Sequence, residues 1–159
     1  MNLQDYKDVF VFAEQRDGVI QNVALELLGK ARELADANNE KVVAILLGKN
    51  IKDKAQDLIA AGADKVLVVD HDLLATYLTE PYTQAITQII KEQKPSILLI
   101  GATTIGRDLG PRVSARNVTG LTADATKLET KNSVGSQLPM AKSITMGSDH
   151  SPAGLSVQR

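Results

Sequence analysis

Residues 101–116, "GATTIGRDLGPRVSAR", carry the residue types in this chain that are best suited to hold an anion. A glycine and two threonines follow an apolar run and precede a helical pattern. Backbone N–H groups and the positive end of a helix dipole would converge at this turn, which suits a phosphate. The candidate ligand-binding or interface residues here are Gly101, Thr103, Thr104, Gly106, Arg107 and Asp108.

The same stretch also has a purely structural interpretation. It matches neither the Walker loop nor G-x-G-x-x-G, and its glycines and threonines would then allow close packing and cap a helix. Pro111 inside a helix costs about 3 kcal/mol. The helix is therefore either kinked, or Asp108 caps a helix that has Pro111 in its first turn. Arg112 and Arg116 share a helix face and could clamp a phosphate or a carboxylate, or be solvated surface.

Continuous apolar runs alternate with amphipathic stretches along the chain, which predicts a doubly wound α/β fold with a parallel sheet. The segment 121–126 is expected to be a fifth strand nearer the edge. In the stretch 51–63, Leu58 and Ile59 are expected to face inward and Gly62 to end the helix. Strands are predicted at 8–14, 41–48, 64–70 and 96–101, and amphipathic helices within 19–39, 51–63 and 71–95.

Ligands of parallel α/β sheets collect beyond the carboxyl ends of the strands, where the strand order reverses. Glu14 and Gln15 follow the first predicted strand, so they join the candidate ligand or interface residues, although a carboxylate and an amide are equally suited to holding a loop. The other strand ends to inspect are Gly48 with Lys49, Asp70 with His71, and 101–107.

Composition excludes several classes of function. The 18 Lys and Arg residues balance 19 Asp and Glu residues, so nucleic acid is not an expected partner. The chain has no cysteine and only two histidines, His71 and His150, so we expect no metal site. No G-x-S-x-G elbow organises a triad, and we expect no catalytic side chains. The start has no targeting pattern, so we expect a cytoplasmic protein without membrane contact.

Three segments resemble the α subunit of electron transfer flavoproteins: "NLQDYKDVFVFAEQRDGVIQNVALELLGKARELAD" (2–36), "GATTIGRDLGPRVSAR" (101–116) and "TGLTADATKLE" (119–129). The resemblance covers residues 1–129 and implies the first domain of that subunit, with a Rossmann-like, adenine nucleotide alpha hydrolase-like sheet of about five strands and helices on both faces. It further implies a heterodimer with a β subunit. That heterodimer carries electrons on FAD between dehydrogenases, acyl-CoA dehydrogenases among them, and an acceptor.

The family's FAD contacts lie in a carboxy-terminal domain that has no counterpart here. The resemblance therefore implies that this chain alone binds no FAD and that 101–116 is a structural and interface element. Residues 130–159 diverge from the family, and we expect them to be a poorly ordered tail or one edge strand near "MAKSITM" (140–146). Two alternatives stay open, a nucleotide-binding module resembling universal stress proteins and a truncated fragment without function.

Overall fold

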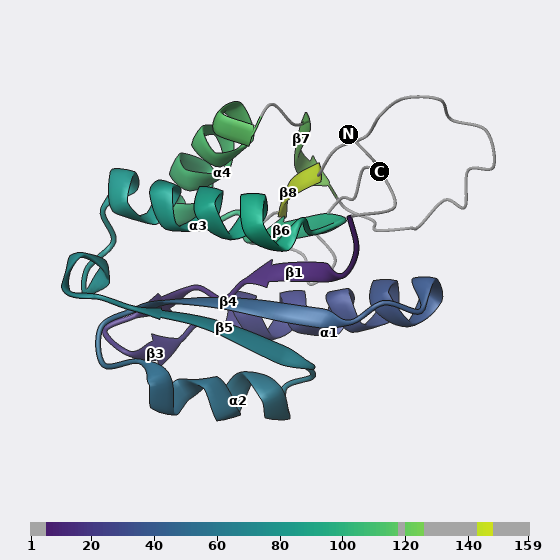
Figure 1. Cartoon of the computed structure of the whole chain (residues 1–159), viewed down its shortest axis with the longest axis horizontal. Helices are drawn as coiled ribbons and strands as arrows, with labels where there is room; N and C mark the ends of the chain where they lie inside the picture. Colours follow the sequence, from purple (N-terminus) through teal and green to yellow (C-terminus); the bar gives the residue numbers. More distant parts are fainter. Residues whose placement is uncertain (1–5, 118–119, 126–142, 148–159) are drawn as a thin grey trace.

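A parallel sheet of six strands organises the chain (Figure 1). The computed structural model describes residues 6–117, 120–125 and 143–147. Across the sheet the strands run in the order β5-β4-β1-β6-β8-β7, and every neighbouring pair is parallel. The strands are β1 (Val9–Phe12), β4 (Val42–Gly48), β5 (Lys65–Asp70), β6 (Ile97–Ile100), β7 (Gly120–Ala125) and β8 (Ser143–Gly147).

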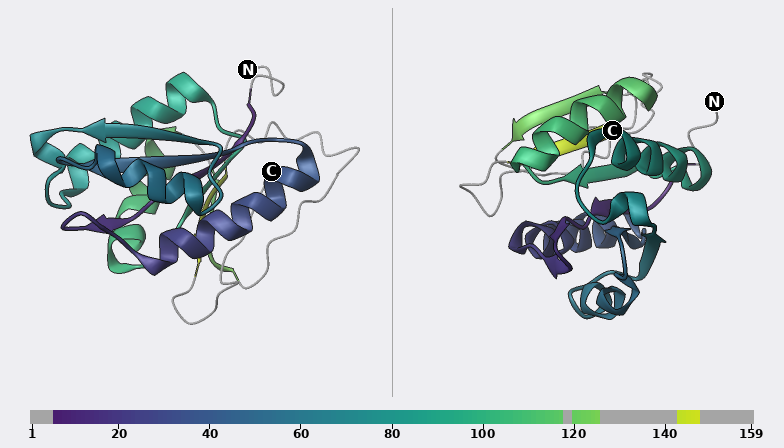
Figure 2. Two further views of the ribbon diagram at one scale, coloured as in Figure 1. Left: turned by 90° about the horizontal axis from the view of Figure 1, so that it is seen from below. Right: turned by 90° about the vertical axis from the view of Figure 1, so that its left-hand side faces the viewer.

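Helices cover both faces of this sheet, as the two views of Figure 2 show. Side chains alternate along β1, so Val9 and Val11 face the layer with α1 and α2, and Phe10 and Phe12 face the layer with α3 and α4. The helices are α1 (Asn22–Asn38), α2 (Ala55–Ala60), α3 (Thr79–Gln93) and α4 (Thr104–Asn117), with short 3-10 turns η2 (Lys52–Lys54) and η3 (Asp72–Leu74).

The predicted doubly wound topology is confirmed. From β1 the chain builds outward through β4 to β5, and then crosses back to place β6 on the other side of β1. The strand order therefore reverses between β1 and β6. All residues of these two strands are buried, as the apolar runs predicted.

The carboxy-terminal part of the sheet differs from the expectation. The strand at 120–125 does lie at the sheet edge, but the strand at 143–147 lies between β6 and β7 and not at the edge. Ser143 pairs with Ile97 on one side and with Gly120 on the other, so both of its neighbours are parallel strands. The expectation of a poorly ordered tail concerns residues 130–142 and 148–159, which lie outside the described part.

Two predictions for the helices are wrong in detail. Val19 and Ile20 form strand β3, which pairs with β2 (Gln15–Arg16) in a hairpin, so α1 begins only at Asn22. Ile59 is 38% exposed and does not face inward, whereas Leu58 is buried. Because α2 spans only residues 55–60, its inward face is too short to bury both side chains. The chain does turn at Gly62, with φ at +121°.

Candidate functional site

A cleft of about 470 Å³ opens at the carboxyl ends of β1 and β6, where the strand order reverses. Parallel α/β sheets bind ligands at this position. The walls come from the hairpin after β1, the segment after η3 and the first turn of α4. The lining residues are Gln15, Arg16, Asp17, Ala75, Thr76, Tyr77, Thr104 and Ile105.

The glycines of the turn beneath this cleft are required by close packing. A Cβ on Gly101 would lie 2.5 Å from Cγ2 of Val23 in α1. A Cβ on Gly106 would lie 1.8 Å from the backbone oxygen of Gly101. The first turn of α4 thus approaches the end of β6 more closely than any side chain permits, which agrees with the structural interpretation of this stretch.

Thr103 joins the helix to a buried carboxylate. Its Oγ1 accepts from the backbone N–H of Gly106 at 3.0 Å, which caps α4 as predicted. The same hydroxyl donates to Oε1 of Glu14. Glu14 is only 4% exposed, and Nη2 of Arg16 lies 3.9 Å from its other oxygen. The structure therefore brings Glu14 and Thr103 together, although they are 89 residues apart in the chain.

Gln15 serves the hairpin. Its Nε2 donates to the backbone oxygen of Leu47 at 3.0 Å, and its Oε1 accepts from the N–H of Gly18 at 2.9 Å. Asp17 and Gly18 have φ of 51° and 80°, the conformation of a tight hairpin turn. The Asp17-Gly18 pair is the signal for this hairpin in the sequence, and the predictions from sequence did not use it.

Asp108 does not cap α4, which contradicts one of the two sequence alternatives. The helix runs from Thr104 through Pro111 to Asn117. The Asp108 carboxylate accepts from Oγ1 of Thr79 at 2.5 Å and from the hydroxyl of Tyr77 at 2.6 Å. These bonds tie α4 to the segment that follows η3.

The same contacts shift the pKa values of Asp108 and Tyr77 in opposite directions. The hydrogen bonds from Thr79 and Tyr77 lower the pKa of Asp108. Burial, and then the hydrogen bond to Asp108, raise the pKa of Tyr77 to about 12. Tyr77, Thr79 and Arg16 are among the site residues that the sequence did not single out.

Arg112 and Arg116 of α4 have carboxylate partners. Nε of Arg112 lies 3.6 Å from Asp108, and Arg116 binds Glu80 at the start of α3. Neither points to an arginine clamp for phosphate. The backbone N–H of Arg107 donates to the oxygen of Thr103 at 2.8 Å, as expected within the first turn of a helix.

The other strand ends serve the loops around them and do not line the cleft. Asp70 accepts from the N–H groups of Asn50 and Ile51 at 3.0 and 3.1 Å, and these bonds lower its pKa. Nδ1 of His71 accepts from the N–H of Leu73 at 3.0 Å, which caps η3.

Three exposed apolar side chains lie on the two segments that supply walls of the cleft, the hairpin and the segment around η3. Val19 on the hairpin is 62% exposed, and Leu73 and Leu78 on the segment around η3 are 58% and 51% exposed. We call these three residues the apolar rim. Where exposed apolar side chains form a contiguous patch, they mark an interaction site.

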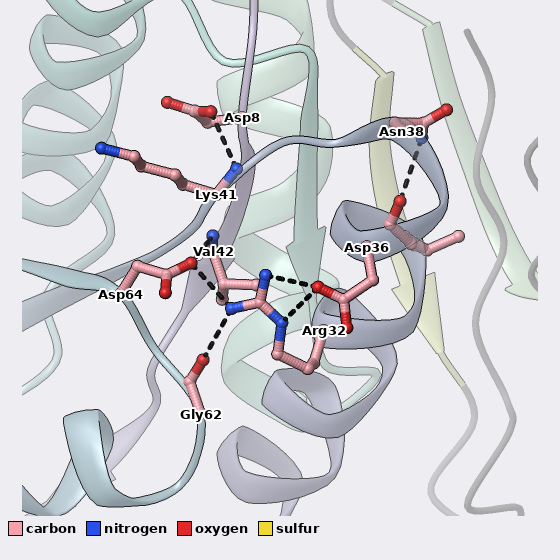
Figure 3. Close-up of polar contacts among 9 residues, drawn as sticks. Asp8, Arg32, Asp36, Asn38, Lys41, Val42, Gly62 and Asp64 are labelled. Atoms are coloured by element: carbon pink, nitrogen blue, oxygen red, sulfur yellow. Dashed lines mark hydrogen bonds and ion pairs between the residues drawn. The ribbon is translucent and has the colours of Figure 1, made fainter.

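A second polar network lies at the amino end of the sheet (Figure 3). Nη1 of Arg32, on α1, donates to Oδ2 of Asp64 at 2.7 Å, and Nε donates to Asp36 at 3.0 Å. Asp64 also accepts from the N–H of Val42 at 2.9 Å. This network ties α1 to the starts of β4 and β5.

Within the described ranges, no cluster of three or more His, Asp or Glu side chains is arranged to hold a metal ion. None of the helices in this part of the chain combines the length and apolar character that a membrane crossing needs.

The amino-acid sequence of this chain matches a known protein family. The family described as "Electron transfer flavoprotein domain" matches residues 9–159. An electron transfer flavoprotein subunit alpha from Clostridium acetobutylicum is 55% identical over 129 residues, which are 81% of this chain and 38% of that protein. The subunit alpha from Thermoanaerobacterium thermosaccharolyticum is 54% identical over 127 residues, 80% of this chain and again 38% of the relative.

Among solved structures, a universal stress protein from Archaeoglobus fulgidus in complex with dAMP is similar in fold. The matched region covers 65% of this chain and 89% of that protein's chain. The identity is 16% and the TM-score 0.46. This likeness is too remote to support the alternative of a nucleotide-binding module.

Proposed function

The chain belongs to the electron transfer flavoprotein family, and we propose that it supplies the first domain of an α subunit, which scaffolds a heterodimer with a β subunit. The observation that carries this proposal is the identity of 54% to 55% with α subunits over about four fifths of the chain. The chain spans 38% of the length of these relatives. The electron-carrying activity and the dehydrogenase partners of a whole α subunit are therefore part of the proposal.

In this proposal the heterodimer carries FAD, and the flavin supplies the electron chemistry. The residues around the cleft hold the fold together and do not bind the flavin. Three of their polar side chains support this division, because Glu14, Gln15 and Asp108 already bond to groups within the chain. In a dinucleotide site a carboxylate of this kind accepts from the ribose hydroxyls.

The residues that the sequence singled out have a supporting role in the proposed assembly. Gly101, Thr103 and Gly106 fix the first turn of α4 against β6. Thr104 and Gln15 line the cleft, and Asp108 holds the segment after η3. Arg107 lies on the same first turn. Together they hold the hairpin and the η3 segment in place, and with them the apolar rim, which we propose contacts the β subunit.

Size-exclusion chromatography with the matching β subunit tests this proposal, with absorbance read at protein and flavin wavelengths. We expect the two chains to co-elute. Leu73→Asp, on the apolar rim, should weaken the complex, because it places a charge at a surface that must lose water on binding. Ile59→Asp is the matched control, an exposed apolar residue on α2. Failure of the wild-type chain to co-elute, or equal weakening by both variants, would count against the proposal.

A further inference from the structure

The turn of the hairpin carries two residues that can react with each other. Asp17 and Gly18 are the only Asp-Gly pair in the 159 residues of the chain. They connect β2 to β3, with φ of 51° and 80°. A Cβ on Gly18 would meet nothing within 4 Å. The turn is therefore uncrowded beside the backbone nitrogen that follows Asp17.

The carboxylate of Asp17 is free to turn toward that nitrogen. Its side chain is exposed, and no hydrogen bond or ion pair joins it to another residue that the structure describes. Other aspartates of the sheet differ in this respect, because Asp64, Asp70 and Asp108 each accept hydrogen bonds. Their carboxylates are held, whereas that of Asp17 is not.

The side chain of Gln15 holds the nitrogen of Gly18 in place. Its Oε1 accepts from the N–H of Gly18 at 2.9 Å, and its Nε2 donates to the backbone oxygen of Leu47 at 3.0 Å. The hairpin strands add only two paired positions, and so short a hairpin opens locally at small cost. The Gln15 side chain is therefore the link that fixes the turn to β4.

We propose that Asp17 is a modification site, at which aspartate converts to isoaspartate through a succinimide, and that the Gln15 side chain slows this reaction. The nitrogen of Gly18 bonds to Cγ of Asp17, and one carboxyl oxygen leaves as water with the amide proton and a proton from solvent. Water then adds to the backbone carbonyl carbon of Asp17 and breaks its bond to the Gly18 nitrogen. One water is released and one is consumed, so the product keeps the mass of the original chain.

The product would change the hairpin and one wall of the cleft. In isoaspartate the chain runs through Cβ and Cγ, which adds one atom to the backbone of the turn. A two-residue loop fixes the register of its hairpin, so a longer loop would disturb the pairing of Arg16 with Val19. Both Arg16 and Asp17 line the cleft. The reaction needs only the turn and water, and it does not depend on the proposed function.

Incubation of the purified chain at neutral pH, below its melting temperature, tests the site. Electron-transfer fragmentation of its peptides distinguishes isoaspartate from aspartate, although the two have equal mass. We expect isoaspartate to accumulate at Asp17 faster than at Asp64, Asp70 or Asp108, whose carboxylates are held. Accumulation at Asp17 that is no faster than at these three residues would overturn the proposal.

Gln15→Met tests the restraint. Methionine has a similar length but no oxygen to accept from Gly18, so isoaspartate should form about fivefold faster, the factor expected for one hydrogen bond. Gln21→Met is the matched control, because Nε2 of Gln21 donates to the oxygen of Val19 at 2.9 Å in the same hairpin and this bond does not involve Gly18. It should leave the rate unchanged. Circular dichroism at the incubation temperature checks that both variants are folded. Equal rates in the two variants would overturn the role of Gln15 and with it the proposal.

Discussion

The backbone oxygen of Gly101 occupies the space in which a side chain on Gly106 would begin, 1.8 Å from the position of its Cβ. The end of β6 and the start of α4 are therefore packed backbone to backbone. This contact requires glycine at position 106.

Gly106→Ala should destabilise the protein by about 3 kcal/mol, because the backbone must move to admit a methyl group. Gly29→Ala is the control, since a Cβ there meets nothing within 4 Å. Glycine is unfavourable inside a helix, so this change should stabilise by about 0.5 to 1 kcal/mol. Urea unfolding of the three proteins measures both changes. Equal stabilities of Gly106→Ala and wild type would contradict the packing described.

Much of the architecture could be predicted because it depends on local patterns. The buried strands β1, β4, β5 and β6 are continuous apolar runs, which a parallel sheet requires. The hairpin was missed because its strands are two residues each, too short for any periodicity. The Asp17-Gly18 turn was its one local signal.

The site was predictable in part. The cap by Thr103 follows from local turn chemistry, whereas the need for glycine at position 101 depends on Val23 of α1. The alternative in which Asp108 caps the helix is wrong, and its true partners Tyr77 and Thr79 lie 31 and 29 residues away. Long-range pairs of this kind depend on how the layers pack and leave no periodic trace in the sequence.

Thr103→Val should cost about 2 to 3 kcal/mol of unfolding free energy. Valine keeps the shape of threonine but removes the hydroxyl that donates to the buried carboxylate of Glu14. Thr104→Val is the control, because Thr104 is exposed, and it should change stability by less than about 0.5 kcal/mol. Chemical denaturation monitored by circular dichroism separates the two. A cost as small as that of the control would mean that the Glu14 contact does not hold the helix.

Tyr77→Phe should alter the stability profile at high pH. The folded pKa of Tyr77, about 12, lies above its ordinary value near 10. As pH rises through this window the unfolded chain releases the phenolic proton first, so the wild type loses stability that it holds fully below pH 10. The variant should decline less over the same window. Identical slopes of melting temperature against pH for the two proteins would contradict the assignment.

At the amino end of the sheet, Asp64→Ala should lower the unfolding free energy more than Arg32→Met does. Asp64 accepts from the N–H of Val42 as well as from Arg32, so its loss leaves a backbone donor without that partner and should cost about 1 to 2 kcal/mol. The Arg32 pair is partly exposed and should contribute about 0.5 kcal/mol. Thermal unfolding of both variants at pH 7 measures the difference. The reverse order would show that the ion pair dominates.

The Asp64 carboxylate should also make the stability of the fold depend on pH in acid. The hydrogen bond from Val42, and then Arg32, lower the folded pKa of Asp64 below its ordinary value of 3.8. The contribution of Asp64 to the unfolding free energy is therefore fully present above the pKa of the unfolded chain. It is lost as pH falls through the pKa of the folded protein. Asp64→Ala should lack this part of the acid decline. Acid unfolding curves that coincide in shape for wild type and variant would rule it out.

Hydrogen exchange of the full chain, with and without the matching β subunit, tests most directly whether it assembles as the first domain of an electron transfer flavoprotein α subunit. The account predicts new protection at the hairpin 15–20 and in the segment 71–79, where the apolar rim lies. Unchanged exchange throughout the chain, at β subunit concentrations well above those of the chain, would contradict it.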